Sequence, residues 1–182
     1  MGPRLRFRLE SVPRLPDLPP QVTLLGRDTE TPAHLVLKLL GWFMFHRPGL
    51  RLEPPRPIPG LRYRPDLLAC DAAGRPELWV ECGDCRVAKL RRVVRATGGI
   101  PLRVLKSSER EARLLWEEAA VDPPLAKSLR VIGFHGRDMA ELLAGIRPDN
   151  LFCWLGRRRE PPSIEFELNG LWHQLGFRSW PD

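Results

Sequence analysis

The order of strand-like and helix-like segments is the feature that most constrains the fold of this 182-residue chain. Hydrophobic periodicity and turn residues predict these elements in order: strand 4–10, helix 32–46, a hairpin of strands 64–70 and 77–82, helix 85–97, strand 101–106, helix 108–120, strand 129–134, helix 137–145, strand 150–156, and a hairpin of strands 163–168 and 171–177. Strands that alternate singly with helices pair in parallel, whereas hairpin strands pair antiparallel. The sequence therefore predicts an α/β fold, with a mixed sheet flanked by helices on both faces and a C-terminal β-hairpin.

Local signals set the expected ends of two helices. Thr31 is the expected N-cap of helix 32–46, which carries a stripe of apolar residues and is predicted to be the central core helix. Asp84 is the expected cap of helix 85–97. Rigid proline-rich loops are expected at 13–20, 54–59 and 161–162.

The length of the chain is sufficient for one hydrophobic core without disulfides or a structural metal. We expect a single domain over residues 1–182. No run of 18 apolar residues occurs, and the N-terminus lacks the apolar region of a secretory signal. The sequence therefore predicts no membrane span and a cytoplasmic location.

The charge balance is strongly positive, with a formal net charge of +7. Of the 29 basic residues only four are lysines, which lie at positions 38, 89, 106 and 127. This excess favours a nucleic-acid partner, because binding to phosphates releases counterions. Arginine-rich codon usage in a GC-rich genome explains the same composition, so both interpretations stay open.

The hairpin before helix 85–97 has a register that the sequence specifies. If its turn is centred between Ala73 and Gly74, Asp66 lies directly opposite Glu81. One face of the hairpin then carries Asp66, Leu68, Cys70, Glu77, Trp79 and Glu81. The other face is entirely apolar and is expected to belong to the core.

Two opposed carboxylates repel each other by about 3 kcal/mol at an effective dielectric constant near 20. Three arrangements would relieve this repulsion: protonation of one carboxyl group, an arginine between the two, or a divalent cation that binds both. The oxygen ligands would suit Mg²⁺ or Mn²⁺. The spacing alone does not select one of the three.

The same hairpin carries a resemblance to known proteins. Arg64-Pro65-Asp66, the turn, and Glu77-Leu78-Trp79-Val80-Glu81-Cys82-Gly83 resemble the hairpin of the PD-(D/E)xK nuclease superfamily. More closely, the chain resembles the YaeQ family, a bacterial branch of that superfamily. This similarity covers nearly the whole chain, including the helix start Glu30-Thr31-Pro32 and the strand Leu129-Arg130-Val131-Ile132.

The resemblance implies a restriction-endonuclease-like core in which Asp66 and Glu81 bind Mg²⁺ or Mn²⁺, with Glu30 from the first helix as a further acidic ligand. Such a metal polarises a phosphodiester and activates water, while a lysine stabilises the transition state. The motif places that lysine two residues after Glu81, where this chain has Gly83. Lys89 is the candidate substitute; the alternative is that it belongs to a solvated basic face.

Arginines near the motif are candidates for contact with a phosphate backbone, namely Arg64, Arg86 and Arg92. The loop at 157–159 is a further basic segment, for which a solubilising hairpin tip is at least as favoured. His34 and Lys38 either line the mouth of the site or form a surface pair, and we expect the surface pair. Cys82 and Cys85 have the spacing of zinc or dithiol motifs, but without a second cysteine pair we favour buried or incidental thiols.

Two functions follow as hypotheses. The first is a metal-dependent nuclease whose catalytic residues are Asp66, Glu81 and Lys89. The second is a degenerate member of the fold that binds nucleic acid or a protein partner without catalysis. Gly83 favours the second hypothesis, whereas the opposed carboxylates favour the first.

Overall fold

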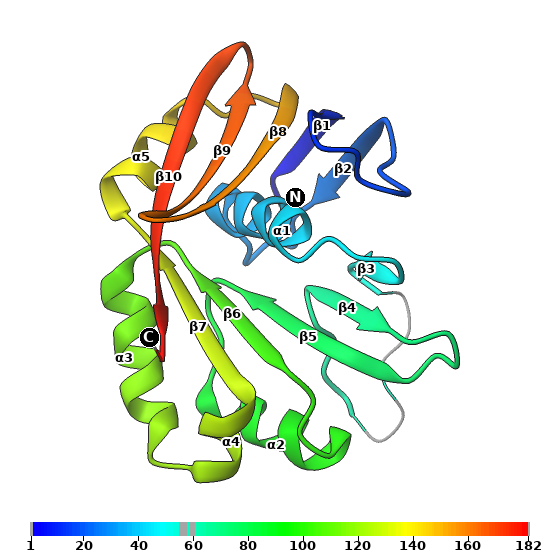
Figure 1. Ribbon diagram of the computed structural model, residues 1–182, viewed down its shortest axis with the longest axis vertical. Coiled ribbons are helices and arrows are strands. Elements are labelled where there is room, and N and C mark those ends of the chain that lie inside the picture. Colours follow the sequence, from blue (N-terminus) through cyan, green and yellow to red (C-terminus); the bar gives the residue numbers. More distant parts are fainter. Residues whose placement is uncertain (1, 55–57, 59–60, 182) are drawn as a thin grey trace.

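The computed structural model describes residues 2–54, 58 and 61–181 and contains one ten-stranded sheet with the strand order β2-β1-β8-β9-β10-β7-β6-β5-β4-β3 (Figure 1). The strands are β1 (Arg4–Ser11), β2 (Gln21–Leu25), β3 (Leu50–Leu52), β4 (Leu67–Cys70), β5 (Pro76–Cys82), β6 (Leu102–Lys106), β7 (Leu129–Phe134), β8 (Asp149–Arg159), β9 (Pro162–Leu168) and β10 (Leu171–Trp180). The helices are α1 (Pro32–Met44), α2 (Val87–Thr97), α3 (Glu109–Ala120), α4 (Pro123–Ser128) and α5 (Gly136–Ala144).

The sheet is mixed, as predicted. Strands β5, β6 and β7 are parallel neighbours, as are β1 and β8. The hairpins β4–β5 and β9–β10 are antiparallel. The C-terminal hairpin turns at Asn169 and Gly170, which both have positive φ and therefore suit a tight two-residue turn.

The sheet curves around α1, so that its two halves lie above and below this helix in Figure 1. We call the face toward α1 and α5 the inner face and the face toward α2, α3 and α4 the outer face. Each face has its own apolar core. Eight residues of α1 are buried, which confirms the prediction of a central core helix.

The register of the β4–β5 hairpin agrees with the sequence prediction from Leu67 to Ala69 but not at Cys70, which pairs with Pro76. Leu67 pairs with Val80, and Leu68 pairs with Trp79. A bulge after Ala69 then shifts the register. The apolar face packs on the inner core, as expected, but the opposite face is also largely buried because Leu68 and Trp79 enter the outer core.

Several local expectations were wrong. Asp84 does not cap α2, which begins after Arg86 without a side-chain cap. The sequence did not predict β2, β3 or α4. Each is six residues or shorter, so periodicity carries little signal. Most of the proline-rich segment 54–59 lies outside the described residues.

No helix among the described residues is long and apolar enough to cross a membrane.

Candidate metal centre

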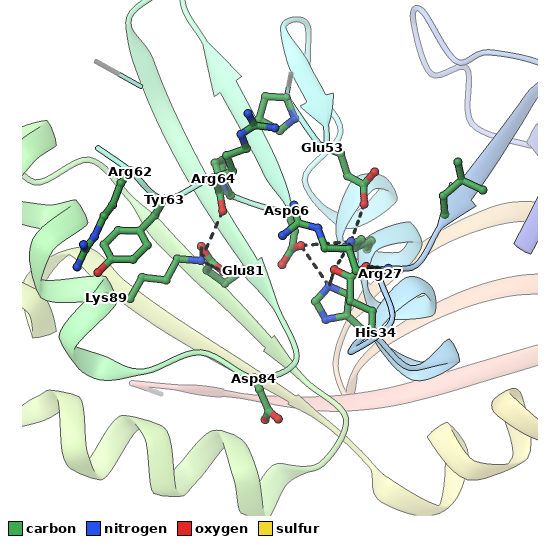
Figure 2. A pocket seen from close by; sticks show the side chains of 15 residues that line it. Arg27, His34, Glu53, Arg62, Tyr63, Arg64, Asp66, Glu81, Asp84 and Lys89 are labelled. Atoms are coloured by element: carbon green, nitrogen blue, oxygen red, sulfur yellow. Dashed lines mark hydrogen bonds and ion pairs between the residues drawn. The ribbon is translucent and has the colours of Figure 1, made fainter. Parts of the chain in front are cut away.

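A cleft of about 600 Å³ opens where the β4–β5 hairpin meets the start of α1 (Figure 2). Its walls contain side chains from α1, α2, the hairpin and the segments that follow the edge strands β2 and β3. Glu30, Asp66, Glu81 and Lys89 all line it. The structure thus brings all the predicted catalytic and metal-binding residues to one cleft.

Asp66 lies immediately before β4, where the hairpin register fixes its position. Its Oδ2 accepts a 2.7 Å hydrogen bond from the Cys82 backbone N–H, and its Oδ1 lies 3.2 Å from Nε2 of His34. Burial opposes ionisation of Asp66, but His34, the positive charge of Lys38 and the Cys82 N–H outweigh it and lower the pKa of this carboxyl group. Asp66 is therefore an anion near neutral pH.

Glu30 approaches the same point from the residue before the N-cap Thr31, at the start of α1 as expected. Its Oε1 lies 3.1 Å from Nε2 of His34, and its Oε2 accepts a hydrogen bond from the Arg27 N–H. One ligand atom each from Glu30, His34 and Asp66 lie within 4.8 Å of one another. Such a set of two carboxylates and one imidazole can hold a divalent cation.

Lys38 lies one turn of α1 beyond His34 and has an exposed fraction of only 1%. Its Nζ lies 3.0 Å from Glu30, 2.6 Å from Glu53 and 3.5 Å from Asp66. Burial opposes its charge, but these carboxylates outweigh burial and raise the pKa of Lys38. The expectation that His34 and Lys38 form a surface pair was therefore wrong, because both belong to the site.

Glu81 lies beside this cluster and points toward α2 (Figure 2). Its carboxylate lies 2.7 Å from Nζ of Lys89 and accepts a 2.6 Å hydrogen bond from the Trp79 indole N–H. Burial raises the pKa of Glu81 to about 7, and the charge of Asp66 adds to this effect, while Lys89 opposes it. Lys89 thus reaches the motif glutamate from the helix that follows the motif strand.

Gly83 occupies the position where the motif that this hairpin resembles has lysine, and its backbone conformation disfavours residues other than glycine. Its φ is +69°, and a Cβ there would lie 3.0 Å from Nδ1 of His34. A lysine at this position would therefore both strain the backbone and press on His34.

Substitution of Gly83 can be compared with substitution of Gly74, which has φ +79° but no atom within 4 Å of an added Cβ. We expect Gly74→Ala and Gly83→Ala each to cost about 1 kcal/mol of stability from backbone strain. Only Gly83→Ala should also weaken Mn²⁺ binding, because it displaces His34. Urea unfolding and calorimetry test both expectations, and equal metal affinities for the two variants would contradict the second.

The stability of the metal-free protein should depend on pH through Glu81. Its pKa of about 7 in the folded state exceeds its usual value of 4.5, so the folded protein holds this proton more tightly than the unfolded chain. The stability that the proton contributes is complete below pH 4.5 and is lost as the pH rises through 7. Between pH 5 and pH 8, we expect wild type to lose about 2–3 kcal/mol relative to Glu81→Gln. Urea unfolding in EDTA measures this difference, and parallel pH profiles would contradict it.

Charged side chains of both signs line the cleft. The carboxylates are those of Glu30, Glu53, Asp66, Glu81 and Asp84, and the basic groups are those of Arg27, Lys38, Arg62, Arg64 and Lys89. When all of these groups are ionised and His34 is neutral, the lining carries no net charge. The described ion pairs of Asp66 and Glu81 involve His34, Lys38 and Lys89, so within this part of the chain no arginine bridges the two acids.

The thiol groups of Cys82 and Cys85 are not part of this ligand group. Burial raises the pKa of Cys82 well above its usual value and that of Cys85 to about 12, so both remain thiols. Among the described residues, the group of potential ligands that lie close enough together contains Glu30, His34 and Asp66 and no cysteine. A zinc or dithiol site at these cysteines has no support in this geometry.

The predicted nucleic-acid-binding arginines lie along the cleft and its continuation. Arg64 lines the first cleft, and Arg86 and Arg92 line an adjoining cleft of about 790 Å³. The two clefts share Arg62, Tyr63, Asp84 and Lys89. Arg92 donates a 2.6 Å hydrogen bond to the Tyr63 hydroxyl group.

The sequence does not indicate Glu53, whose carboxylate also lines the cleft. This residue directly follows the three-residue strand β3. The Glu53 N–H donates to the Asp66 carbonyl, so pairing of β3 with β4 brings it to the site. No local motif marks this residue.

Comparison with known proteins agrees with the resemblance to YaeQ proteins. The crystal structure of the YaeQ protein from Xanthomonas axonopodis pv. citri has a TM-score of 0.74 at 18% identity, with 99% of this chain and 98% of that chain covered. The YaeQ protein from Pseudomonas syringae has a TM-score of 0.71 at 14% identity, with 100% and 97% covered. These identities show the shared fold alone. No functionally curated protein matches. Residues 19–149 match the family described as YaeQ protein, and since this match spans more than half of the sequence, the chain belongs to the YaeQ family.

Proposed function

We propose that this protein is a divalent-metal-dependent phosphodiesterase of the PD-(D/E)xK nuclease type that acts on nucleic acid. The observation that carries the proposal is the convergence of Glu30, His34 and Asp66 on one point, with Glu81 and Lys89 beside it. A restriction-endonuclease-like core agrees with the arrangement of the β4–β5 hairpin, the parallel strands β5, β6 and β7, and α1.

Glu30, His34 and Asp66 would hold Mn²⁺ or Mg²⁺, and the imidazole shifts the preference toward Mn²⁺. When bound, such an ion polarises a phosphodiester and lowers the pKa of water. The Cys82 N–H fixes the Asp66 carboxylate, while Arg27 fixes that of Glu30. Both ligands are therefore oriented before a metal binds.

Glu81 and Lys89 supply the remaining chemistry of the site. With a pKa of about 7, Glu81 is present in both protonation states at neutral pH and can accept a proton from a nucleophilic water. Lys89 holds an ammonium group 2.7 Å from it, where a cation can stabilise charge that develops on a phosphate. In this proposal, Lys89 takes the role of the motif lysine, whose position Gly83 occupies.

A cleavage assay tests the proposal. Purified protein is incubated with labelled single- and double-stranded DNA and RNA, in Mn²⁺ or in EDTA. We expect cleavage of at least one substrate in Mn²⁺ and none in EDTA. Cleavage that persists in EDTA would contradict the metal centre. The Lys89→Ala variant addresses the substitute lysine, and unchanged cleavage by this variant would dismiss its role.

The second candidate function is binding of nucleic acid or a protein partner without catalysis. Lys38 favours it, because an ammonium group within 3.5 Å of three carboxylates neutralises much of their charge without a metal. Absence of cleavage for every substrate, together with no heat of Mn²⁺ binding in calorimetry, would support this function over the nuclease.

A further inference from the structure

A second concentration of positive charge lies on the inner face of the sheet, away from the metal centre. Arg103 of β6 and Arg130 of β7 are direct neighbours across two parallel strands. Leu105 and Ile132 follow them by two residues and belong to the inner core, so the two arginines also face inward. Like charges in this arrangement destabilise a sheet unless an anion compensates them.

A β-bulge in β8 adds two more arginines to this face. Trp154 pairs with Phe166 but Gly156 pairs with Glu165, so Leu155 is the extra residue. The bulge reverses the side-chain alternation beyond it. Arg157 therefore lies opposite Ile164, which is part of the inner core. Arg159, two residues further along, faces the same way.

Packing on an aromatic ring fixes the direction of Arg157. Its guanidinium group lies 5.0 Å from the centre of the Phe177 ring, and Phe177 pairs with Phe134 of β7. Arg130 lies close enough to act electrostatically on both Arg103 and Arg157. Burial, with these neighbouring charges, lowers the pKa of both Arg103 and Arg157. The four residues therefore form one cluster, which we call the inner arginine patch (Arg103, Arg130, Arg157 and Arg159).

The patch lacks carboxylate partners in the part of the chain that the structure describes. Half-buried Arg103 donates to the Leu102 carbonyl group, and no ion pair of the described residues includes a member of the patch. Arg158 differs, because it projects to the opposite side of β8 and lies 2.6 Å from Glu165. Among the described residues, the arginine on one side of the strand is thus paired with a carboxylate, whereas those on the inner side are not.

We propose that the inner arginine patch binds phosphate groups of a nucleic-acid backbone, at a site separate from the metal centre. The positive charge calls for a polyanion, and the choice of nucleic acid rests on the proposed function. Guanidinium groups suit phosphate oxygens because they offer several donors in one plane.

The position of the patch extends the surface that a nucleic acid would contact. The patch lies near the C-terminal end of α1, because Arg47, which follows this helix, acts electrostatically on Arg103. The metal centre lies at the other end, where His34 is in the first turn. The 13 residues of α1 span about 20 Å. This length corresponds to about six base pairs of a duplex. The patch and the metal centre would therefore contact phosphates several nucleotides apart.

Binding in EDTA tests the patch independently of catalysis. Fluorescence anisotropy of a labelled 20-base-pair duplex and a labelled 20-nucleotide single strand is measured with the full chain over a series of salt concentrations. For the double variant Arg103→Ala/Arg130→Ala we expect at least about tenfold weaker binding. The plot of log binding constant against log salt concentration should also be less steep, by about 0.9 in slope for each duplex phosphate that the variant no longer neutralises. Arg159→Ala should show the same trend.

Arg158→Ala is the matched control, since Arg158 lies beside two patch residues but faces the other way. We expect it to bind within about twofold of wild type. Equal affinities for Arg158→Ala and Arg159→Ala would overturn the proposal, as would wild-type protein that binds inorganic phosphate but neither oligonucleotide. Thermal unfolding of each variant excludes loss of folding as the cause. Wild-type protein that binds the oligonucleotides but cleaves none of them in Mn²⁺ would contradict the metal centre alone, and weaker binding by the patch variants would leave that centre untouched.

Discussion

The Asp66→Asn variant is expected to lose Mn²⁺ binding and, with it, all metal-dependent cleavage. The substitution removes a negatively charged ligand but keeps the size of the side chain. Loss of residues that merely orient metal ligands costs about 10- to 100-fold in affinity, so loss of this carboxylate should cost at least about 100-fold. Calorimetric titration with Mn²⁺ measures the affinity directly.

A second aspartate of the same hairpin provides the control for this experiment. Asp71 lies in the turn of the same hairpin and forms an exposed ion pair with Arg75, remote from the cleft. The Asp71→Asn variant should retain the metal affinity of wild type within about twofold. If Asp66→Asn binds Mn²⁺ as tightly as this control does, Asp66 is not a ligand and the proposed centre is wrong.

The Lys38→Met variant should have the largest effect on stability. Methionine keeps the volume of the side chain but removes an ammonium group that has an exposed fraction of 1% and contacts three carboxylates. Breaking a buried ion pair by removal of one partner costs about 3–5 kcal/mol, because the remaining charges lose their counterion. For a protein of this size, we expect the melting temperature to fall by about 10 °C.

Metal binding should partly reverse this loss. A cation that binds between Glu30 and Asp66 replaces the missing positive charge, and at 100 times its dissociation constant it stabilises the folded state by about 2.7 kcal/mol. Mn²⁺ should therefore raise the melting temperature of Lys38→Met more than that of wild type. Lys127→Met is the control, since Lys127 is exposed. An equal response of all three proteins to Mn²⁺ would contradict the link between Lys38 and the metal centre.

The sequence was sufficient to predict the β4–β5 hairpin and its register up to Ala69, because strand alternation and the turn between Asp71 and Pro76 are local signals. It did not predict the bulge that shifts the pairing of Cys70. It could not predict that Lys38 and Glu53 join the site. Their meeting depends on how α1 lies across the sheet and on pairing of β3 with β4, and neither has a local signature. The expected cap at Asp84 was wrong for a different reason. Aspartate is a suitable capping residue, but Asp84 lies two residues before the position where a cap of α2 would be, which is Arg86.

The departure at Gly83 could be found from the sequence, but its explanation required the three-dimensional structure. Gly83 is visible in the sequence as a departure from the motif, and Lys89 is the candidate substitute, with a solvated basic face as the alternative. The reason for the departure needed backbone angles and the position of His34, because a glycine is required only where φ is positive or atoms approach closely. The contact between Lys89 and Glu81 likewise depends on where α2 starts, which was predicted two residues too early.

Helix α1 has a consequence for the dynamics of the site. The same 13 residues that carry His34 and Lys38 also bury six apolar side chains in the inner core. Local opening of this helix would expose that core, so the helix cannot unfold alone at low cost. The backbone amides of α1 should therefore exchange with solvent deuterium only when the whole domain unfolds. Ligands on such a helix keep their geometry between binding events, and metal release should proceed without local melting of the protein.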